Sequence, residues 1–129
     1  MTIIKFPSKK NEPAFLNDIE EDGYHVYSLK NAKIPGYYPP ELPEYPGVNI
    51  KDLQVVDVIT IRVFFRIGKG KNMRIDGGHI NLKVEHIDDS DTVLAVILTE
   101  LPEEFPLKAG GSLEIFEDEI LYKTMVTVH

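Results

Sequence analysis

The stretch that decides the fold is Gly78–Ile87, GHINLKVEHI, in the second half of the 129-residue chain. Apolar side chains at Ile80, Leu82 and Val84 alternate along it with polar ones. Alternation with a period of two is typical of a β-strand that has one buried and one solvent-facing side. The stretch therefore predicts a half-buried strand, and a less regular form of the pattern recurs through most of the C-terminal part of the chain.

Four further segments carry strand signals around this one. They are rich in β-branched and aromatic residues and are separated by short turns or loops: Val55–Ile67, Thr92–Thr99, Ser112–Phe116 and Leu121–Val128. Val55–Ile67 is long for a single strand, which predicts a bend or a bulge. Thr92–Thr99 is apolar at most positions, so we expect it to be buried on both faces. Five strands joined by short links favour a small antiparallel barrel, because closure removes exposed strand edges.

The N-terminal part of the chain predicts two shorter elements. Asn11–Asp22 indicates a short helix, with Asn11 as the N-cap and Pro13 in the first turn, where its missing N–H costs nothing. Tyr24–Leu29 is rich in aromatic and β-branched residues and indicates a strand.

A segment rich in proline and tyrosine follows at Ile34–Val48. Its five prolines exclude a regular helix or a central strand. We expect a long loop that is held across the core by Tyr37, Tyr38 and Tyr45, because a stiff loop loses little entropy when it is ordered. The alternative is a peptide that docks into an aromatic groove of a partner protein.

Together these segments predict a mainly β fold of the α+β class. We expect a small antiparallel five- or six-stranded β-barrel with one short N-terminal helix and a Pro/Tyr-rich loop. Residues 1–129 are long enough for a single domain with its own core, in which residues 1–50 supply the helix, a strand and the loop, and residues 51–129 supply the barrel. The chain has no cysteine and no apolar run long enough to span a membrane, which favours a cytoplasmic location.

Two stretches prompt a comparison with a known group of proteins. GGHINLKVEHIDDSD (Gly77–Asp91) and LPEEFPLKAGGSLEIFEDEI (Leu101–Ile120) resemble a family of small bacterial β-barrel domains of uncharacterised function. The alternating strand, the turn at Ile87–Asp88 and the loop with proline match that family, whereas Gly111–Ser112 replaces its usual Gly-Asp. The resemblance implies a fold rather than an activity and brings no catalytic residues. Because some relatives are immunity proteins of toxin systems, it also implies an inhibitor-like role.

The net charge of −7 is spread unevenly along the chain. Residues 88–129 carry 10 acidic and 2 basic groups. An acidic chain repels nucleic acid at long range, so nucleic acid is not the expected partner. Carboxylates from this part of the chain would instead speed association with a basic protein, and the candidates for such a surface are Glu100, Glu103, Glu104, Glu117, Asp118 and Glu119. The simpler interpretation of these charges is solubility.

Residues 51–87 are basic, with 7 basic and 4 acidic groups. Arg62, Phe64 and Arg66 share one face of the predicted strand Val55–Ile67, and Arg74 and Lys83 lie nearby in the sequence. A basic face that contains an aromatic ring is typical of barrels that bind single strands. The alternative is a solvated outer face that keeps edge strands from pairing.

No motif indicates an enzyme, a metal or a cofactor, and the enzyme question stays open at this point. His79 and His86 are seven residues apart, which places them on opposite faces of one strand. The expected function is a non-enzymatic protein-interaction module, immunity- or inhibitor-like, that uses the tyrosines of the loop and the acidic surface. The alternative is binding of an anion or of single-stranded nucleic acid through Arg62, Arg66, Arg74 and Lys83. His129 ends the chain and is either native or part of a tag.

Overall fold

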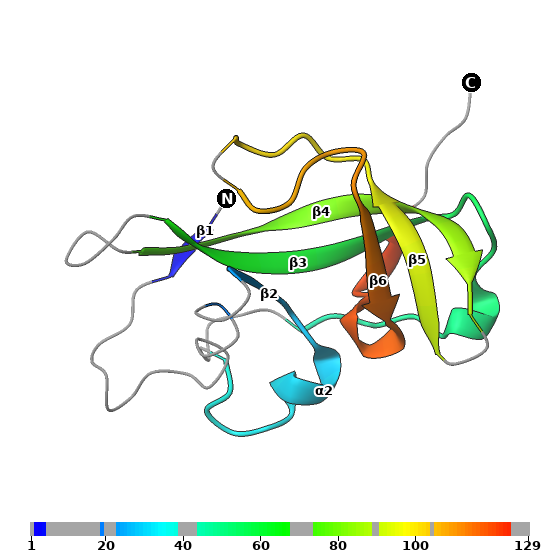
Figure 1. Ribbon diagram of the computed structural model, residues 1–129. Helices are drawn as coiled ribbons and strands as arrows, with labels where there is room; N and C mark the ends of the chain where they lie inside the picture. The colour runs from blue at the N-terminus through cyan, green and yellow to red at the C-terminus, as the bar shows by residue number, and fades with distance from the viewer. Residues whose placement is uncertain are drawn as a thin grey trace.

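The computed structural model describes residues 2–4, 19, 23–38, 44–67, 74–88, 91–103 and 105–124, with the backbone alone at residues 2–4, 67 and 74–76. Within them, seven strands form one antiparallel sheet in which β2, β3, β4, β5 and β6 are neighbours in that order (Figure 1). The strands are β1 (Thr2–Ile4), β2 (Tyr24–Val26), β3 (Val58–Ile67), β4 (Arg74–Ile87), β5 (Thr92–Ile97), β6 (Ser112–Phe116) and β7 (Tyr122–Thr124). The helical elements whose bounds fall within the described residues are α2 (Leu29–Ala32), η2 (Ile50–Asp52) and η4 (Glu117–Glu119).

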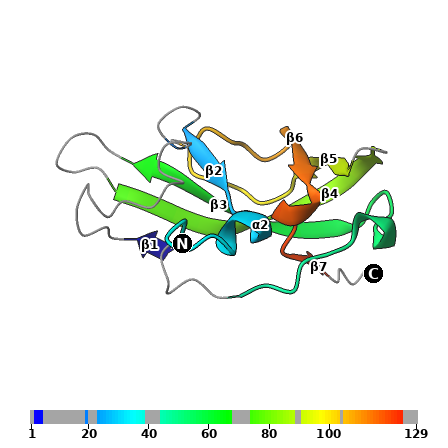
Figure 2. The ribbon, with the colours of Figure 1, turned by 90° about the horizontal axis from the view of Figure 1, so that it is seen from below.

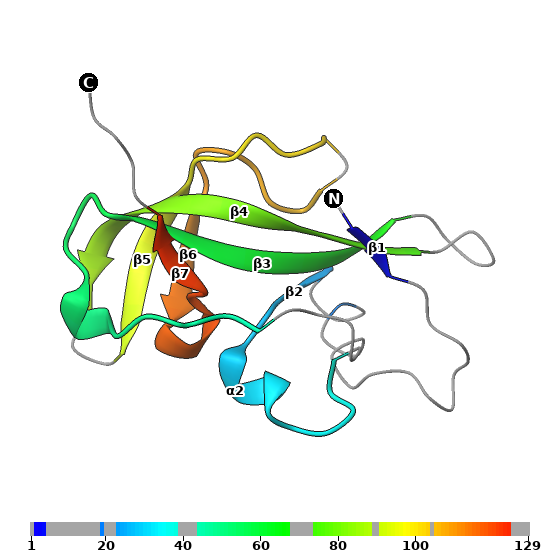
Figure 3. The same ribbon diagram turned by 180° about the vertical axis from the view of Figure 1, so that it is seen from behind.

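The sheet curls into a half-barrel. β4 pairs with β3 along most of its length, and its second half also pairs with β5. The register shifts between Val84 and His86, which marks a bulge that bends β4 from one half of the sheet into the other. After β6, η4 leads the chain back to β7, which pairs with the start of β3 (Figure 3). The predicted small antiparallel barrel-like fold is therefore confirmed, with the bulge in β4 rather than in β3.

The main hydrophobic core lies on one face of β3 and β4. Ile80, Leu82 and Val84 are buried there, as their alternation predicts. They pack with buried side chains of β3, β5, β6 and the following segment, which are Ile59, Ile61, Val63, Val93, Ala95, Ile97, Ile115 and Ile120. Burial of such aliphatic side chains is the largest favourable contribution to folding.

A second, smaller cluster lies on the other face of β3. It is formed by the buried side chains Ile19, Tyr27, Phe64 and Leu121, and the half-buried rings of Tyr37, Tyr38 and Tyr45 pack against it. The Pro/Tyr-rich loop thus crosses the sheet and covers it with its tyrosines, as expected; we call its described parts, residues 34–38 and 44–48, the strap. Of the predicted helix Asn11–Asp22, the structure describes Ile19, which is helical. The other positions of that helix lie outside the described residues.

Two sequence expectations were wrong. The segment Thr92–Thr99 is not buried on both faces, because Leu94 of β5 and Leu98, the residue after β5, are 40% and 46% exposed. The strand predicted over Tyr24–Leu29 ends at Val26, because Ser28 is the N-cap of α2 and its hydroxyl accepts a hydrogen bond from the backbone N–H of Asn31. In the described residues, no helix has the length and apolar character needed to cross a membrane.

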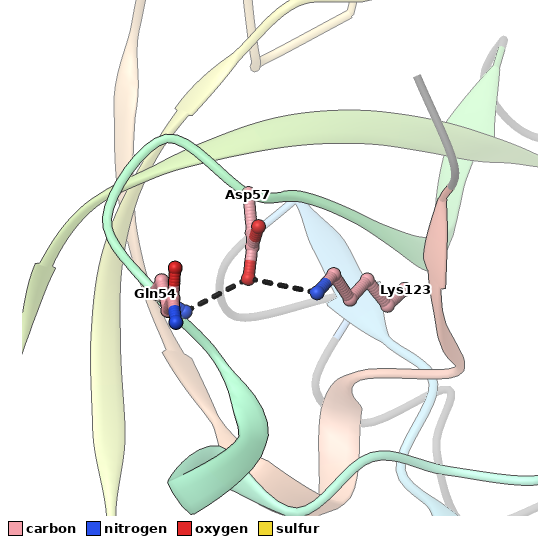
Figure 4. A network of polar contacts seen from close by, with 3 residues as sticks. All are labelled: Gln54, Asp57 and Lys123. Carbon is pink, nitrogen blue, oxygen red and sulfur yellow. Dashed lines mark hydrogen bonds and ion pairs between the residues drawn. The ribbon is translucent and has the colours of Figure 1, made fainter. Parts of the chain in front are cut away.

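A polar network fixes the loop that enters β3 (Figure 4). The carboxylate of Asp57 accepts a hydrogen bond of 2.8 Å from the backbone N–H of Gln54 and lies 3.2 Å from the ammonium group of Lys123. Every second residue from Val55 to Ile67 is apolar, with Asp57 as the exception. The network explains why a carboxylate stands at this position. A partly exposed ion pair of this kind contributes at most about 1 kcal/mol, so its role is to join the loop to β7.

Candidate functional site

A groove separates the two ends of the sheet. Its volume is about 490 Å³, and its walls come from β2 and α2 on one side and from β6 and η4 on the other. Figure 2 views this side of the molecule, with α2 between the ends of β2 and β6. Among the described strands, β2 pairs with β3 alone and β6 with β5 alone, so the groove is the opening of the half-barrel.

On β2, the backbone groups that point into the groove belong to Val26. The N–H of Tyr27 donates to the carbonyl oxygen of Arg62 at 2.8 Å, so Tyr27 faces β3. In an antiparallel pair, successive residues direct their N–H and C=O groups to opposite edges. The N–H and C=O of Val26 therefore face the open edge, and neither has a hydrogen-bond partner in the described part of the chain.

On β6, the same alternation exposes the backbone of Glu114. The N–H of Ile97 donates to the carbonyl of Gly111 at 2.9 Å, which sets the hydrogen-bonded positions of the β5–β6 pair. Glu114 lies three residues after Gly111 and opposite Leu94 of β5. Because hydrogen-bonded and non-hydrogen-bonded pairs alternate along an antiparallel ladder, Glu114 falls at a non-hydrogen-bonded position. Its N–H and C=O point away from β5, and within the described residues they too have no partner.

At one end of the groove the open edge is closed by η4. The N–H of Phe116, at the end of β6, donates to the carboxyl oxygen of Glu119 at 2.9 Å. The pKa of Glu119 is raised to about 7, mainly by burial; the hydrogen bond from Phe116 opposes this rise and the charge of the neighbouring Asp118 adds to it. The hydroxyl of Ser28 donates to the carboxylate of Asp118, which ties α2 to η4. The groove therefore contains a carboxyl group that changes its charge near neutral pH.

A second unusual feature lies beneath the strap, at Arg62 of β3. The residue is 4% exposed, and it lies directly opposite His79 of β4. Its Nη1 donates to the hydroxyl of Tyr45 at 2.8 Å, and its guanidinium carbon lies 5.4 Å from the centre of the Phe64 ring. Its Nε is buried without a hydrogen-bond partner, and no carboxylate of the described residues forms an ion pair with it.

Tyr45 connects Arg62 to His79. The Tyr45 hydroxyl lies 3.0 Å from Nε2 of His79. A hydroxyl has one proton, and because its oxygen accepts from Arg62, we assign that proton to the hydrogen bond with His79. Nε2 of His79 is then an acceptor and the imidazole is neutral. This agrees with the pKa of His79, which burial and the charge of Arg62 lower.

The charge of Arg62 is poorly compensated by the protein. A buried cation costs several kcal/mol unless it is paired and hydrogen-bonded. One hydrogen bond to a charged group contributes about 1.5–3 kcal/mol, and a cation–π contact about 0.5–2 kcal/mol. Neither contact neutralises the charge. Among the buried polar side chains of the described residues, Arg62 is therefore the one whose charge and hydrogen-bonding groups are least compensated.

A third feature is a small apolar cavity of about 140 Å³ between the core and residues 99–107. Val63, Phe65 and Ile80 form one side of it, and Leu101, Phe105 and Leu107 form the other. Its volume is close to that of a cavity that holds one benzene molecule and well below the roughly 300–1,000 Å³ of ordinary ligand sites. We therefore treat it as a packing feature.

The structure disperses the residues of the expected basic face. The register places Arg62 and His79 on the same side of the sheet, as the alternation suggests, but the strap covers Arg62 and Phe64. Arg66 is exposed and Lys83 is half-buried. Arg74 begins β4, and its side chain lies outside the described part of the structure.

The tyrosines expected to contact a partner make contacts within the protein. The hydroxyl of Tyr38 accepts a hydrogen bond of 2.9 Å from the N–H of Ser28 and lies 2.6 Å from Nε2 of His25. Tyr37 packs against Tyr38 and His25. With Tyr45 bound to Arg62, the three tyrosines hold the strap on the sheet.

The acidic residues of the expected surface fall in different places. Glu117 accepts a hydrogen bond of 3.0 Å from the N–H of Ile50, and Asp118 binds Ser28 at the groove. Glu103 is exposed, and Glu104 lies outside the described residues. Of the described members of this set, Asp118 and Glu119 line the groove between β2 and β6, together with Glu114.

Among the described residues, no group of three or more histidine, aspartate or glutamate side chains is arranged to hold a metal ion. Comparison of the chain with models of protein families, with characterised proteins and with solved structures finds no match.

Proposed function

We propose that the protein is a non-enzymatic protein-interaction module that binds an extended segment of a partner polypeptide between β2 and β6. The observation that carries this proposal is the pair of strand edges that face each other across the groove, where the backbone groups of Val26 and Glu114 have no hydrogen-bond partner among the described residues. An added strand would satisfy the backbone groups of one or both edges, which is a common mode of peptide recognition.

The charge distribution supports a basic partner. The acidic excess of residues 88–129 includes Glu114, Asp118 and Glu119 at the groove. Complementary charge raises the rate of association between proteins. An inhibitor-like role against a basic protein, which the resemblance to immunity proteins implies, fits within this proposal.

The competing interpretation is that the edges are only protected against aggregation. β2 and β6 are short, with three and five residues, and Glu114 places a charge on one of them. Short, charged edges are a known defence against unwanted strand pairing. A binding experiment that removes one backbone N–H decides between the two interpretations.

The experiment selects peptides from a random displayed library on the full chain and then measures their affinity for two variants. Glu114→Pro removes the N–H at the open edge, whereas Glu114→Ala removes only the side chain and is the matched control. We expect Glu114→Ala to keep the affinity within about threefold and Glu114→Pro to weaken it at least about tenfold, the effect of losing one hydrogen bond and adding a steric block.

Circular dichroism and thermal unfolding confirm that Glu114→Pro is folded. As a test that leaves the protein unchanged, the selected peptides are made with N-methyl groups at alternate residues. An added strand cannot tolerate methylation on its hydrogen-bonding edge and tolerates it on the other. Peptides that bind equally well in all these forms, or a library that yields no binder, would overturn the proposal.

The alternative, binding of single-stranded nucleic acid, has less support. Its aromatic ring, Phe64, is fully buried, and Arg62 is covered by the strap. Arg66 and Lys83 are the members of that set whose described side chains are accessible to solvent. Oligonucleotide binding at low salt that is lost in the double variant Arg66→Gln, Lys83→Gln would favour this alternative over the peptide groove.

A further inference from the structure

We propose that Arg62, with Tyr45 and His79, forms a covered site for an oxyanion, the carboxylate or phosphate group of a small ligand. This site is on the face of β3 that the strap covers, so the proposal is independent of the peptide groove.

The free edge of the guanidinium is suited to such a group. Nη1 of Arg62 is bound to Tyr45, whereas Nε is buried without a partner. An oxyanion can accept two parallel hydrogen bonds from one edge of a guanidinium, and this geometry is the reason arginine recognises carboxylates and phosphates. In the described residues no protein carboxylate takes this place, and a bound oxyanion would neutralise the buried charge.

Among the described residues of the strap, Tyr45 is the one that hydrogen-bonds Arg62, and the proposal takes its side chain as the one that moves to admit the ligand. Tyr45 is half-buried, and its hydrogen bond with His79 lies at the surface. Two residues later the strap is anchored, because the N–H of Gly47 donates to the carbonyl of Leu121 at 2.8 Å. Gly47 has a φ of +75°, and a side chain there would collide with Leu29, so this anchor is tight.

His79 completes the site when Tyr45 turns away. It faces Arg62 across the two strands, and it is accessible to solvent. Released from the Tyr45 hydroxyl, Nε2 of His79 can take up a proton and donate a hydrogen bond to the same oxyanion. The ligand is thus held by the free edge of Arg62 and replaces the hydroxyl of Tyr45 as the partner of His79.

The test follows the Nε–H signal of Arg62 by NMR during titration of the full chain with inorganic phosphate and, separately, with succinate. We expect a saturable shift of this signal with at least one of the two anions. Tyr45→Phe removes the competing hydroxyl and should tighten binding about tenfold, equivalent to one net hydrogen bond. Arg66→Gln, an exposed arginine of the same strand, is the control and should change the affinity less than about twofold.

The two anions distinguish the two ligand classes. A response to phosphate alone indicates a phosphate ligand, and a response to succinate alone indicates a carboxylate ligand. Arg62→Gln should abolish binding, but the readout on the unmodified chain and on Tyr45→Phe does not depend on that variant being folded. The proposal is overturned if the Nε–H signal stays unchanged in both proteins up to roughly 50 mM anion, far above the millimolar range of weak ligands. It is also overturned if Arg66→Gln weakens binding as much as Arg62→Gln.

Discussion

The hydroxyl of Tyr45 lies 2.8 Å from Nη1 of Arg62, and this contact joins the strap to the middle of β3. It is the only hydrogen bond that the side chain of Arg62 makes within the described residues. The strap and the buried cation therefore depend on each other: the hydroxyl partly satisfies the charge, and the charge fixes the position of the loop. This relation leads to two predictions about stability.

The first concerns the hydroxyl. Tyr45→Phe should lower the free energy of unfolding by about 1–3 kcal/mol, because Nη1 of Arg62 then loses its partner in a buried place. Urea denaturation measures the change. Tyr122→Phe is the control, because Tyr122 is 36% exposed, and it should alter the stability by less than about 0.5 kcal/mol. Equal effects of the two substitutions would show that the Tyr45 hydroxyl does not stabilise the fold.

The second concerns the charge. Arg62→Met keeps much of the side-chain volume and removes an unpaired buried cation, so we expect a stability equal to or higher than that of the unmodified protein, within about 1 kcal/mol. Arg62→Ala also leaves a void and should cost about 2–4 kcal/mol. Urea denaturation of both variants separates charge from packing. A loss with Arg62→Met as large as with Arg62→Ala would mean that the charge itself stabilises the fold.

Local sequence patterns predicted most of the strands, although β1 (Thr2–Ile4) was not expected. Ile80, Leu82 and Val84 are buried as their alternation indicates, and β6 has the predicted bounds Ser112–Phe116. These patterns succeed because the pleat of a strand fixes which side chains share a face. The 3-10 turn η2 begins after Asn49, whose side chain caps it by accepting a hydrogen bond from the N–H of Lys51 at 3.0 Å.

The sequence could not show which segment covers each face. Arg62 alternates with apolar residues as a solvent-facing side chain would, but it is buried, and Tyr45 of the strap, a segment distant in the chain, contacts it there. Glu119 belongs to an acidic run typical of a solvated turn, but the fully buried Ile120 and Leu121 that follow draw this turn against the sheet. The open edges of β2 and β6 depend on which strands pair, and no local pattern encodes that.

The third prediction concerns the contact between Gly77 of β4 and Phe64, which lies opposite it on β3. A Cβ atom at Gly77 would lie 2.9 Å from Cδ1 of Phe64, which is fully buried and has no room to move. Gly77→Ala should therefore lower the free energy of unfolding by about 1–3 kcal/mol, as overpacked cores do. In the double variant with Phe64→Leu the smaller side chain relieves the clash, so the two losses should not add. Strict additivity in urea denaturation would contradict this contact.

The fourth prediction concerns Glu119 and pH. Its pKa is raised from 4.5 to about 7 in the folded protein, mainly by burial. Between these two values the folded state binds more protons than the unfolded state, so the stability that this group contributes is present below about pH 4.5 and is lost as the pH rises through 7. The loss amounts to roughly 2–3 kcal/mol between about pH 5 and pH 8.

Glu119→Gln isolates this contribution, because the amide keeps an oxygen that can accept from the N–H of Phe116 but does not ionise. Urea denaturation should show similar stability of the two proteins near pH 5 and a more stable variant near pH 8, by roughly 2–3 kcal/mol. Glu103→Gln, at an exposed carboxylate, is the control and should leave the difference between the two pH values unchanged. If Glu119→Gln changes stability equally at both pH values, Glu119 does not titrate near neutral pH, and the carboxyl group that closes the groove is ionised throughout this range.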